Sequence, residues 1–129
     1  MKIKGFDIDG VIHLGEFGRG VIPGANDVII TGRSFEEEPE TLSFLRKHGI
    51  HNIVFFNRLK FADKARKSSG IHKANTINAL WKMGIEIEVF FEDDPVQRDE
   101  ISTRCPFVKV VHLNHSLIEK ENVRHVEDM

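Results

Sequence analysis

The sequence KIKGFDIDG, residues 2–10, is a short apolar run that ends in two aspartates and a glycine. Further runs of strand length follow it along the chain. Together the five runs are Lys2–Ile8, Asp27–Ile30, Asn52–Phe56, Ile85–Phe91 and Phe107–Leu113. The second, third and fourth contain continuously apolar stretches, which are typical of strands covered on both faces by helices. The pattern therefore predicts a parallel sheet.

Three segments between these runs have helical features, and they are Pro39–His48, Lys73–Met83 and Pro95–Arg104. Pro39 and Pro95 occupy opening turns, where a helix tolerates proline, and Gly49 is a typical stop. Ser34 and Glu37 also have the spacing of a capping box, which would start the first helix about one turn earlier. The alternation of strands and helices predicts an α/β fold, a three-layer Rossmann-like sandwich with a five-stranded parallel sheet.

The length of 129 residues is that of one domain with a single core. We expect this core to span residues 1–113 and residues 114–129 to form a terminal helix or a tail. No apolar run approaches the roughly 18 residues that cross a bilayer, and no signal-peptide core precedes Asp7. We therefore expect a cytoplasmic protein that does not insert into a membrane. The single cysteine, Cys105, excludes an internal disulfide and a multi-cysteine zinc site.

The overall charge is nearly balanced, with 18 basic and 20 acidic residues, so the chain as a whole has no attraction to nucleic acid. A local exception is the segment Asn57–Lys73, which holds six basic residues and one acid, Asp63. This basic segment could guide an anionic substrate, although such segments are often solvated surfaces. Phe61 is its one aromatic residue, so a base-stacking platform there is thin.

Polar residues follow the strand-like runs at the points where the runs end. They are Asp7-Ile8-Asp9-Gly10, Thr31-Gly32-Arg33, Asn57 and Glu92-Asp93-Asp94. Ligands of open parallel sheets bind outside the carboxyl ends of the strands. Clustered carboxylates repel one another unless a cation or hydrogen bonds offset the repulsion, and oxygen ligands suit Mg²⁺. The sequence therefore predicts an acidic Mg²⁺ site at this edge of the sheet.

Asp7 and Asp9 would point the same way on a continuing strand, but a turn at Gly10 can swing Asp9 aside and leave its carbonyl facing the metal. One carboxylate could then attack while the other handles protons, and an aspartyl-phosphate would divide phosphoryl transfer into two easier steps. The Thr31 hydroxyl and the Gly32 backbone N–H suit a phosphate oxygen.

Two basic residues extend this set. Lys73, at the start of the expected second helix, can neutralise a phosphoryl group and the nearby acids. Arg33 either reaches a phosphate or pairs with Glu36 or Glu37. Each of these features by itself is also typical of an ordinary turn or a solvated helix end, so the functional reading depends on their combination.

In combination, four segments resemble the ordered motifs of the haloacid dehalogenase-like (HAD) phosphohydrolase superfamily, in its small capless phosphatase type. They are Gly5–Ile12, Val28–Arg33, Lys73 and Phe90–Pro95, and the resemblance covers about residues 3 to 111. It implies a Mg²⁺-dependent phosphatase in which Asp7 is the nucleophile that becomes phosphorylated. Asp9 would be the general acid that protonates the leaving group and later activates water.

The resemblance also implies that Thr31 hydrogen-bonds the phosphoryl group and that Lys73 stabilises it. Asp93 would complete the Mg²⁺ shell with Asp7 and the Asp9 carbonyl, and Asp94 would support it. Counting back from the proline that follows, Glu92 and Asp93 fit the acidic pair equally well, so the identity of the metal ligand stays open between these acids.

The sequence departs from many HAD proteins in its shortness. Between Gly10 and Asp27 there is room for a flap, His13–Gly20, but not for the usual helix, and no cap insert is present. An open site suits a phosphorylated substrate that is a nucleotide or a nucleic-acid phosphate end. The alternative is a catalytically silent HAD-fold binding or regulatory module. A receiver domain fits less well because Asn57 stands where its phosphate-accepting aspartate would be. The sequence does not indicate an oligomeric state.

Overall fold

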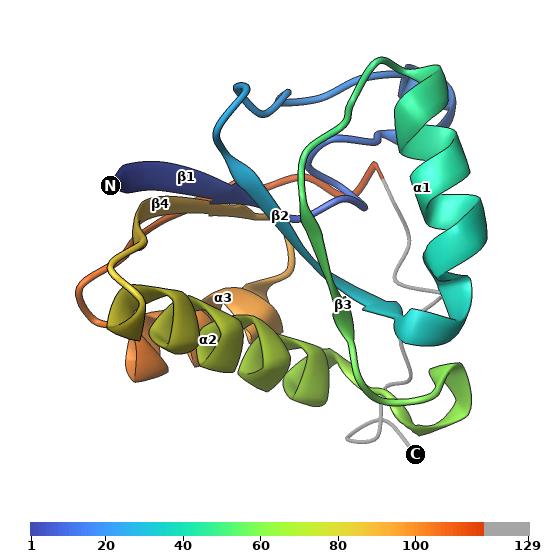
Figure 1. Ribbon diagram of the computed structural model, residues 1–129. Coiled ribbons are helices and arrows are strands. Elements are labelled where there is room, and N and C mark those ends of the chain that lie inside the picture. Colours follow the sequence, from blue (N-terminus) through green and yellow to red (C-terminus); the bar gives the residue numbers. More distant parts are fainter. Residues whose placement is uncertain (118–129) are drawn as a thin grey trace.

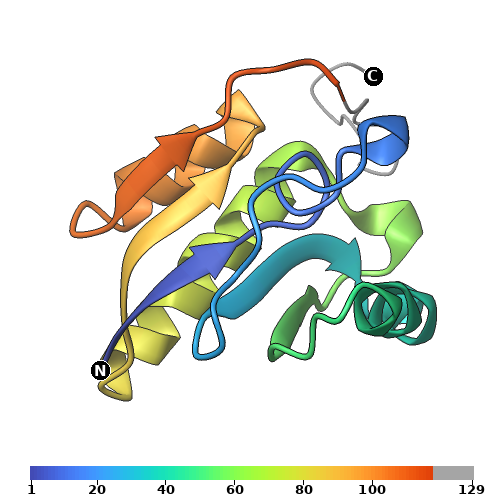
Figure 2. The same ribbon diagram turned by 90° about the horizontal axis from the view of Figure 1, so that it is seen from above.

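The structure is a computed structural model that describes residues 1–117. Its five strands are β1 (Lys2–Phe6), β2 (Val28–Ser34), β3 (Val54–Asn57), β4 (Glu86–Glu92) and β5 (Lys109–His112). They form one sheet in the order β3-β2-β1-β4-β5, and every neighbouring pair is parallel. Figure 2 shows the strands running in one direction, so all their carboxyl ends lie at one edge. The predicted five-stranded parallel sheet is confirmed.

Helices cover both faces of this sheet, which confirms the three-layer Rossmann-like architecture. They are α1 (Glu38–Lys47), α2 (Arg66–Lys82) and α3 (Pro95–Arg104), with short 3-10 turns η1 (Gly15–Phe17), η2 (Phe35–Glu37) and η3 (Phe61–Asp63). In Figure 1, α2 and α3 lie together on one face and α1 lies on the other. One core cluster packs Ile30, Ile77 and Phe90 on the α2 side, and a second packs Ile29 and Leu45 on the α1 side.

The helix α2 begins at Arg66, about two turns before the predicted start at Lys73. Its first turns contain two serines and a glycine, which have lower helix propensity than alanine, so the sequence pattern hides them. Tertiary packing outweighs this propensity. A Cβ added to Gly70 would lie 3.0 Å from the Gln97 Cα of α3, so the glycine permits close contact between the two helices. Lys73 consequently lies within the helix and not at its end.

The strand β2 continues to Ser34, whereas the sequence predicts an end near Ile30 followed by a turn. The pairing with β3 shifts in register between Ile30 and Ser34, so Thr31, Gly32 and Arg33 form an irregularity within the strand. Such bulges re-aim side chains and are frequent beside functional sites.

Ser34 and Glu37 form the predicted capping box, with the Ser34 N–H donating to Glu37 Oε2 at 2.7 Å. The box caps η2, and α1 follows at Glu38 with Pro39 in its first turn. The capping box at Ser34 thus begins the 3-10 turn η2, and Pro39 lies in the first turn of α1, so each of the two predicted starts begins its own helical segment.

The segment after β1 forms the expected flap. Its arms are joined by backbone bonds from Gly20 N to Ile12 O and from Val21 N to Val11 O, both 2.8 Å. Figure 2 shows this loop, which carries η1, beyond the carboxyl ends of the strands. Residues 114–117 are irregular, and the remainder of the predicted terminal helix or tail lies outside the described residues. None of the helices within residues 1–117 is long and apolar enough to cross a membrane.

Candidate active site

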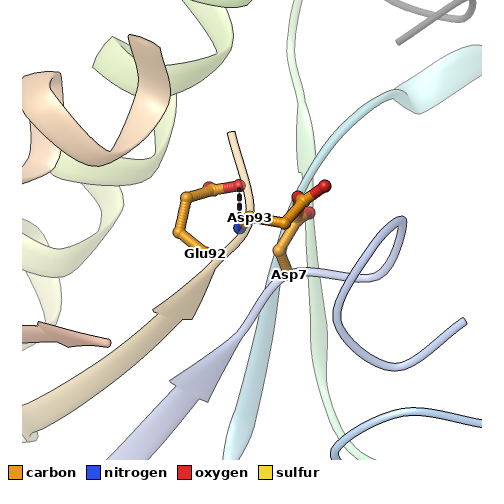
Figure 3. A group of neighbouring side chains, drawn as sticks. All are labelled: Asp7, Glu92 and Asp93. Carbon is orange, nitrogen blue, oxygen red and sulfur yellow. Dashed lines mark hydrogen bonds between the residues drawn. The ribbon is translucent and has the colours of Figure 1, made fainter. Parts of the chain in front are cut away.

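Three buried acids meet where two neighbouring strands end. Asp7 directly follows β1, Glu92 is the last residue of β4, and Asp93 comes next. One carboxylate oxygen of each lies within 4.8 Å of the others. We call Asp7, Glu92 and Asp93 the acidic triad (Figure 3). The parallel pairing of β1 with β4, which places Phe6 beside Phe91, brings these acids together.

Lys73 is the cation that reaches the acidic triad from α2. Its Nζ lies 3.2 Å from Asp7 Oδ1 and 2.6 Å from Glu92 Oε1. Burial disfavours the ammonium, but the charges of Asp7 and Glu92 outweigh that effect and raise the pKa of Lys73. Burial, with the charge of the other acids, raises the pKa of both Asp7 and Glu92. When all three acids are ionised, one ammonium leaves excess negative charge, which a divalent cation would offset.

The hydrogen bonds of Glu92 separate it from the other two acids. Its Oε1 accepts from Lys73, and its Oε2 accepts from the backbone N–H groups of Asp93 and Asp94 at 3.1 and 3.2 Å. Figure 3 shows Glu92 turned back to the Asp93 nitrogen, while the carboxylates of Asp7 and Asp93 lie side by side. Protein donors therefore engage both Glu92 oxygens, and the neighbouring carboxylates of Asp7 and Asp93 are the pair that we take as candidates to hold a metal ion.

The turn at Gly10 fits closely around Asp93. Gly10 has φ 84°, and a Cβ at this position would lie 2.0 Å from Asp93 Oδ2. Any side chain here would therefore displace the carboxylate as well as strain the backbone. The His115 ring nitrogen lies 2.7 Å from the Gly10 carbonyl oxygen, and His112 Nε2 lies 3.1 Å from that of Asp93. The last residue of β5 and the segment that follows it thus contact both sides of this turn.

Asp9 turns away from the acidic triad, as the sequence suggests for a turn at Gly10. Its carboxylate forms a bidentate pair with Arg33, with Oδ1 2.7 Å from Nη2 and Oδ2 2.9 Å from Nε. Arg33 also donates from Nη1 to Thr41 Oγ1 of α1 at 3.1 Å. Burial would raise the pKa of Asp9, but the Arg33 hydrogen bonds and charge outweigh it and lower the pKa. Arg33 pairs with Asp9, and Glu36 and Glu37 bond elsewhere.

Thr31 and Gly32 lie in β2 beside these acids. Thr31 is two residues past Ile29, the partner of Phe6, so the register places it level with Ile8, between Asp7 and Asp9 in the chain and just beyond the end of β1. Its buried hydroxyl accepts from the Arg33 N–H at 3.0 Å, and a hydroxyl that accepts can still donate its own proton. The backbone carbonyl of Gly32 accepts a hydrogen bond from Lys64 Nζ at 3.2 Å.

Asp94 is not brought into the acidic triad. It caps α3, with Oδ1 accepting from the Val96 N–H at 2.9 Å, and it pairs with Arg66 at 2.6 Å. Burial would raise the pKa of Asp94, but the hydrogen bonds from Arg66 and Val96 outweigh it and lower the pKa. Asp94 reaches the site through Gln97, which donates to it at 3.0 Å and accepts from Lys73 at 2.5 Å. Asp94 therefore helps to position Lys73 through Gln97 and does not lie in the acidic triad itself.

Half of the cations in the basic segment have internal acidic partners. Lys64, Arg66 and Lys73 pair with Glu37, Asp94 and the acidic triad respectively. The other three, Arg58, Lys60 and Lys67, are exposed. The positive charge that the segment presents to a substrate is therefore much smaller than its sequence suggests.

Two contributors to the site have no local signal in the sequence. Gln97 and Thr41 are single polar residues on helices, and such residues usually face solvent. Both are buried here, and each bonds a charged residue of another element. Gln97 and Thr41 could have been identified only by asking which helix positions face the sheet, and that requires knowing how the helices pack.

Comparison with protein-family models, curated proteins and solved structures found no match for this chain.

Proposed function

We propose that this chain is a Mg²⁺-dependent phosphomonoesterase that works through a phosphorylated Asp7. The observation that carries the proposal is the division of the two aspartates. Asp7 lies with Asp93 and Lys73 in a buried charged cluster, while Asp9, two residues away, is held apart by Arg33. One carboxylate is thereby placed among charges suited to a phosphoryl group, and the other is available for proton transfer.

The residues present fit a Mg²⁺ ion. The acidic triad offers oxygen donors, carries excess negative charge, and includes two carboxylates that lie side by side. Asp7 and Asp93 would hold the ion, together with the Asp9 carbonyl that the HAD resemblance adds. When bound, the ion supplies positive charge to the phosphoryl oxygens.

In the first step, a carboxylate oxygen of Asp7 attacks phosphorus, and the bond from phosphorus to the leaving oxygen breaks. The leaving oxygen takes a proton from Asp9. In the second step, water attacks the same phosphorus, its proton passes to the Asp9 carboxylate, and the bond between Asp7 and phosphorus breaks to release phosphate. Lys73 and the Thr31 hydroxyl stabilise the negative phosphoryl oxygens in both steps.

The pairing with Arg33 bears on the proton transfers. With its lowered pKa, Asp9 is ionised at neutral pH in the free protein, which suits the base of the second step. The acid of the first step needs a proton on Asp9. A phosphoryl dianion that competes for the Arg33 guanidinium weakens the pair and so raises the pKa of Asp9.

The test is phosphate release from p-nitrophenyl phosphate and a panel of nucleotides. We expect activity that requires Mg²⁺ and falls by about 10³-fold or more in Asp7→Asn, because the nucleophile is lost. Asp63→Asn, which changes an exposed acid of η3, is the matched control and should retain activity. Acid quenching should trap a phosphorylated wild-type protein but no phosphorylated Asp7→Asn.

Two outcomes would contradict the proposal. Mg²⁺-dependent hydrolysis that survives Asp7→Asn would exclude Asp7 as the nucleophile. Mg²⁺ binding without hydrolysis of any substrate would favour a silent binding module. The structure offers little to a receiver-like role, because the residue at the end of β3 is Asn57, whose amide lies 3.5 Å from the Gly32 carbonyl.

A further inference from the structure

A small pocket opens between the flap and α1. Its volume is about 220 Å³, and its walls include Ile12, His13 and Arg19 of the flap segment and Phe44, His48 and Ile50 on the α1 side. The Phe44 ring contacts two imidazoles, with its centroid 4.7 Å from that of His13 and 4.6 Å from that of His48. Backbone hydrogen bonds join the two arms of the flap at Gly20, where a Cβ would lie 1.9 Å from the Val11 carbonyl oxygen. The flap wall of the pocket is therefore formed without a ligand.

The pocket lies on the Asp9 side of the candidate site. His13 forms a backbone bridge with Asp9, and Phe44 follows Thr41, the α1 partner of Arg33, by about one helical turn. A leaving oxygen that takes a proton from Asp9 must lie beside it. An organic group that extends from this oxygen past Arg33 would reach the His13 and Phe44 side of the site.

The walls favour a flat heterocyclic ring. Three ring side chains offer faces and edges to an aromatic partner, while Ile12 and Ile50 exclude water. His13 packs edge to face on Phe44, so the two rings already form an aromatic corner of the pocket. Arg19 adds donors that a ring nitrogen or oxygen can accept. The volume suits one ring system and not a whole nucleotide.

We propose that this flap pocket binds the nucleobase of the leaving group, so that the substrate is a nucleotide phosphorylated on its sugar. This inference rests on the proposed phosphatase function. The interval from Asp9 to Phe44 takes the sugar, which places the phosphate at Asp7 and the base between the flap and α1. A free nucleoside monophosphate and the terminal nucleotide of a strand share this chemistry.

The test compares substrates with and without a base in wild type and Phe44→Leu, a variant that keeps the apolar packing of α1. For adenosine 5′-monophosphate, Phe44→Leu should raise KM roughly tenfold, the loss expected for one stacked base, with kcat nearly unchanged. For ribose 5-phosphate, the variant should match wild type. Phe17→Leu, which alters an exposed flap residue outside the pocket, is the matched control and should change neither substrate.

Further substrates distinguish a free nucleotide from the terminal nucleotide of a strand as the source of the leaving group. A 5′-phosphorylated oligonucleotide with a lower KM than adenosine 5′-monophosphate, and with a steep salt dependence, would assign a strand end. The reverse order would assign a free nucleotide. If p-nitrophenyl phosphate, whose ring joins the phosphate directly, showed the same dependence on Phe44 as the nucleotides, the pocket would not be a nucleobase site.

A binding measurement distinguishes failure of this inference from failure of the phosphatase proposal. Free adenosine should shift the NMR signals of the His13 and His48 rings in wild type and much less in Phe44→Leu. If adenosine causes these shifts but no phosphate is released from any substrate, the pocket stands and the phosphatase falls. If phosphate is released but adenosine causes no shift, or Phe44→Leu alters all substrates equally, the pocket assignment is wrong.

Discussion

Asp7 and Asp9 lie two residues apart on one loop and have opposite surroundings. Asp7 is buried with two other acids and one lysine, and its pKa is raised. Asp9 is half-buried against one arginine, and its pKa is lowered. One short loop therefore holds two carboxylates in different electrostatic environments, because the chain turns at Gly10 between them and Asp93.

The largest expected effect is on the Asp7 side. Lys73→Met removes the cation within the acidic triad and leaves buried, uncompensated carboxylates, so we expect a loss of about 3 to 5 kcal/mol in the free energy of unfolding. Urea denaturation measures this loss. Lys67→Met, an exposed lysine on the same helix, is the matched control and should stay within about 0.5 kcal/mol of wild type.

The sign of the pH dependence follows from the acids. Without Lys73, the pKa values of Asp7 and Glu92 rise further, and a folded-state pKa above the unfolded value makes stability fall as pH rises. The deficit of Lys73→Met should therefore shrink as the pH is lowered, and Mg²⁺ should also reduce it. A deficit that is independent of both pH and Mg²⁺ would mean that the loss is one of packing.

An intermediate effect is expected at the turn that separates the two sides. Gly10→Ala places a methyl group against Asp93 and adopts an unfavourable φ, so it should cost about 1 to 3 kcal/mol and weaken Mg²⁺ binding. Gly84→Ala is the matched control, because it has the same φ of 84° and open space around its Cβ. Calorimetry of Mg²⁺ binding should detect a loss in the first variant only. Equal affinity in both variants would show that the Asp93 contact is unimportant for the ion.

The smallest effect on stability is expected on the Asp9 side. Arg33→Met removes the partner of a carboxylate that is partly solvated, so the free energy of unfolding at pH 7 should fall by about 1 kcal/mol or less. Because the folded-state pKa of Asp9 is depressed, this contribution is present above its ordinary value of 3.8 and disappears as pH falls through the folded-state pKa.

Activity should report the same substitution more clearly than stability does. In Arg33→Met the pKa of Asp9 rises, so the acidic limb of the kcat profile should move to higher pH if Asp9 is the base of the second step. Arg33→Lys, which keeps the charge but loses the bidentate geometry, should show a smaller displacement. An unchanged acidic limb in both variants would remove Asp9 from the rate-limiting proton transfer.

Local sequence signals were enough to predict the parallel α/β sheet and the edge at which its polar residues gather. Apolar periodicity and proline or glycine positions are local signals, so they predict strands and helix ends without knowledge of distant contacts. They also placed Asp7, Thr31 and the acids after β4 at one edge, since parallel strands end together. Local signals were wrong for the start of α2, where packing at Gly70 outweighs low helix propensity.

The partner of each acid, in contrast, depends on the folded arrangement of the chain. Glu92 is tied to Lys73, Asp93 lies beside Asp7, and Asp94 caps α3, although the three acids are consecutive in the sequence. Their directions depend on contacts with residues from other segments, which no local pattern encodes. The same physical reason applies to the pairing of Asp9 with Arg33 and to the pocket at Phe44, because each forms only when the flap, β2 and α1 have assembled.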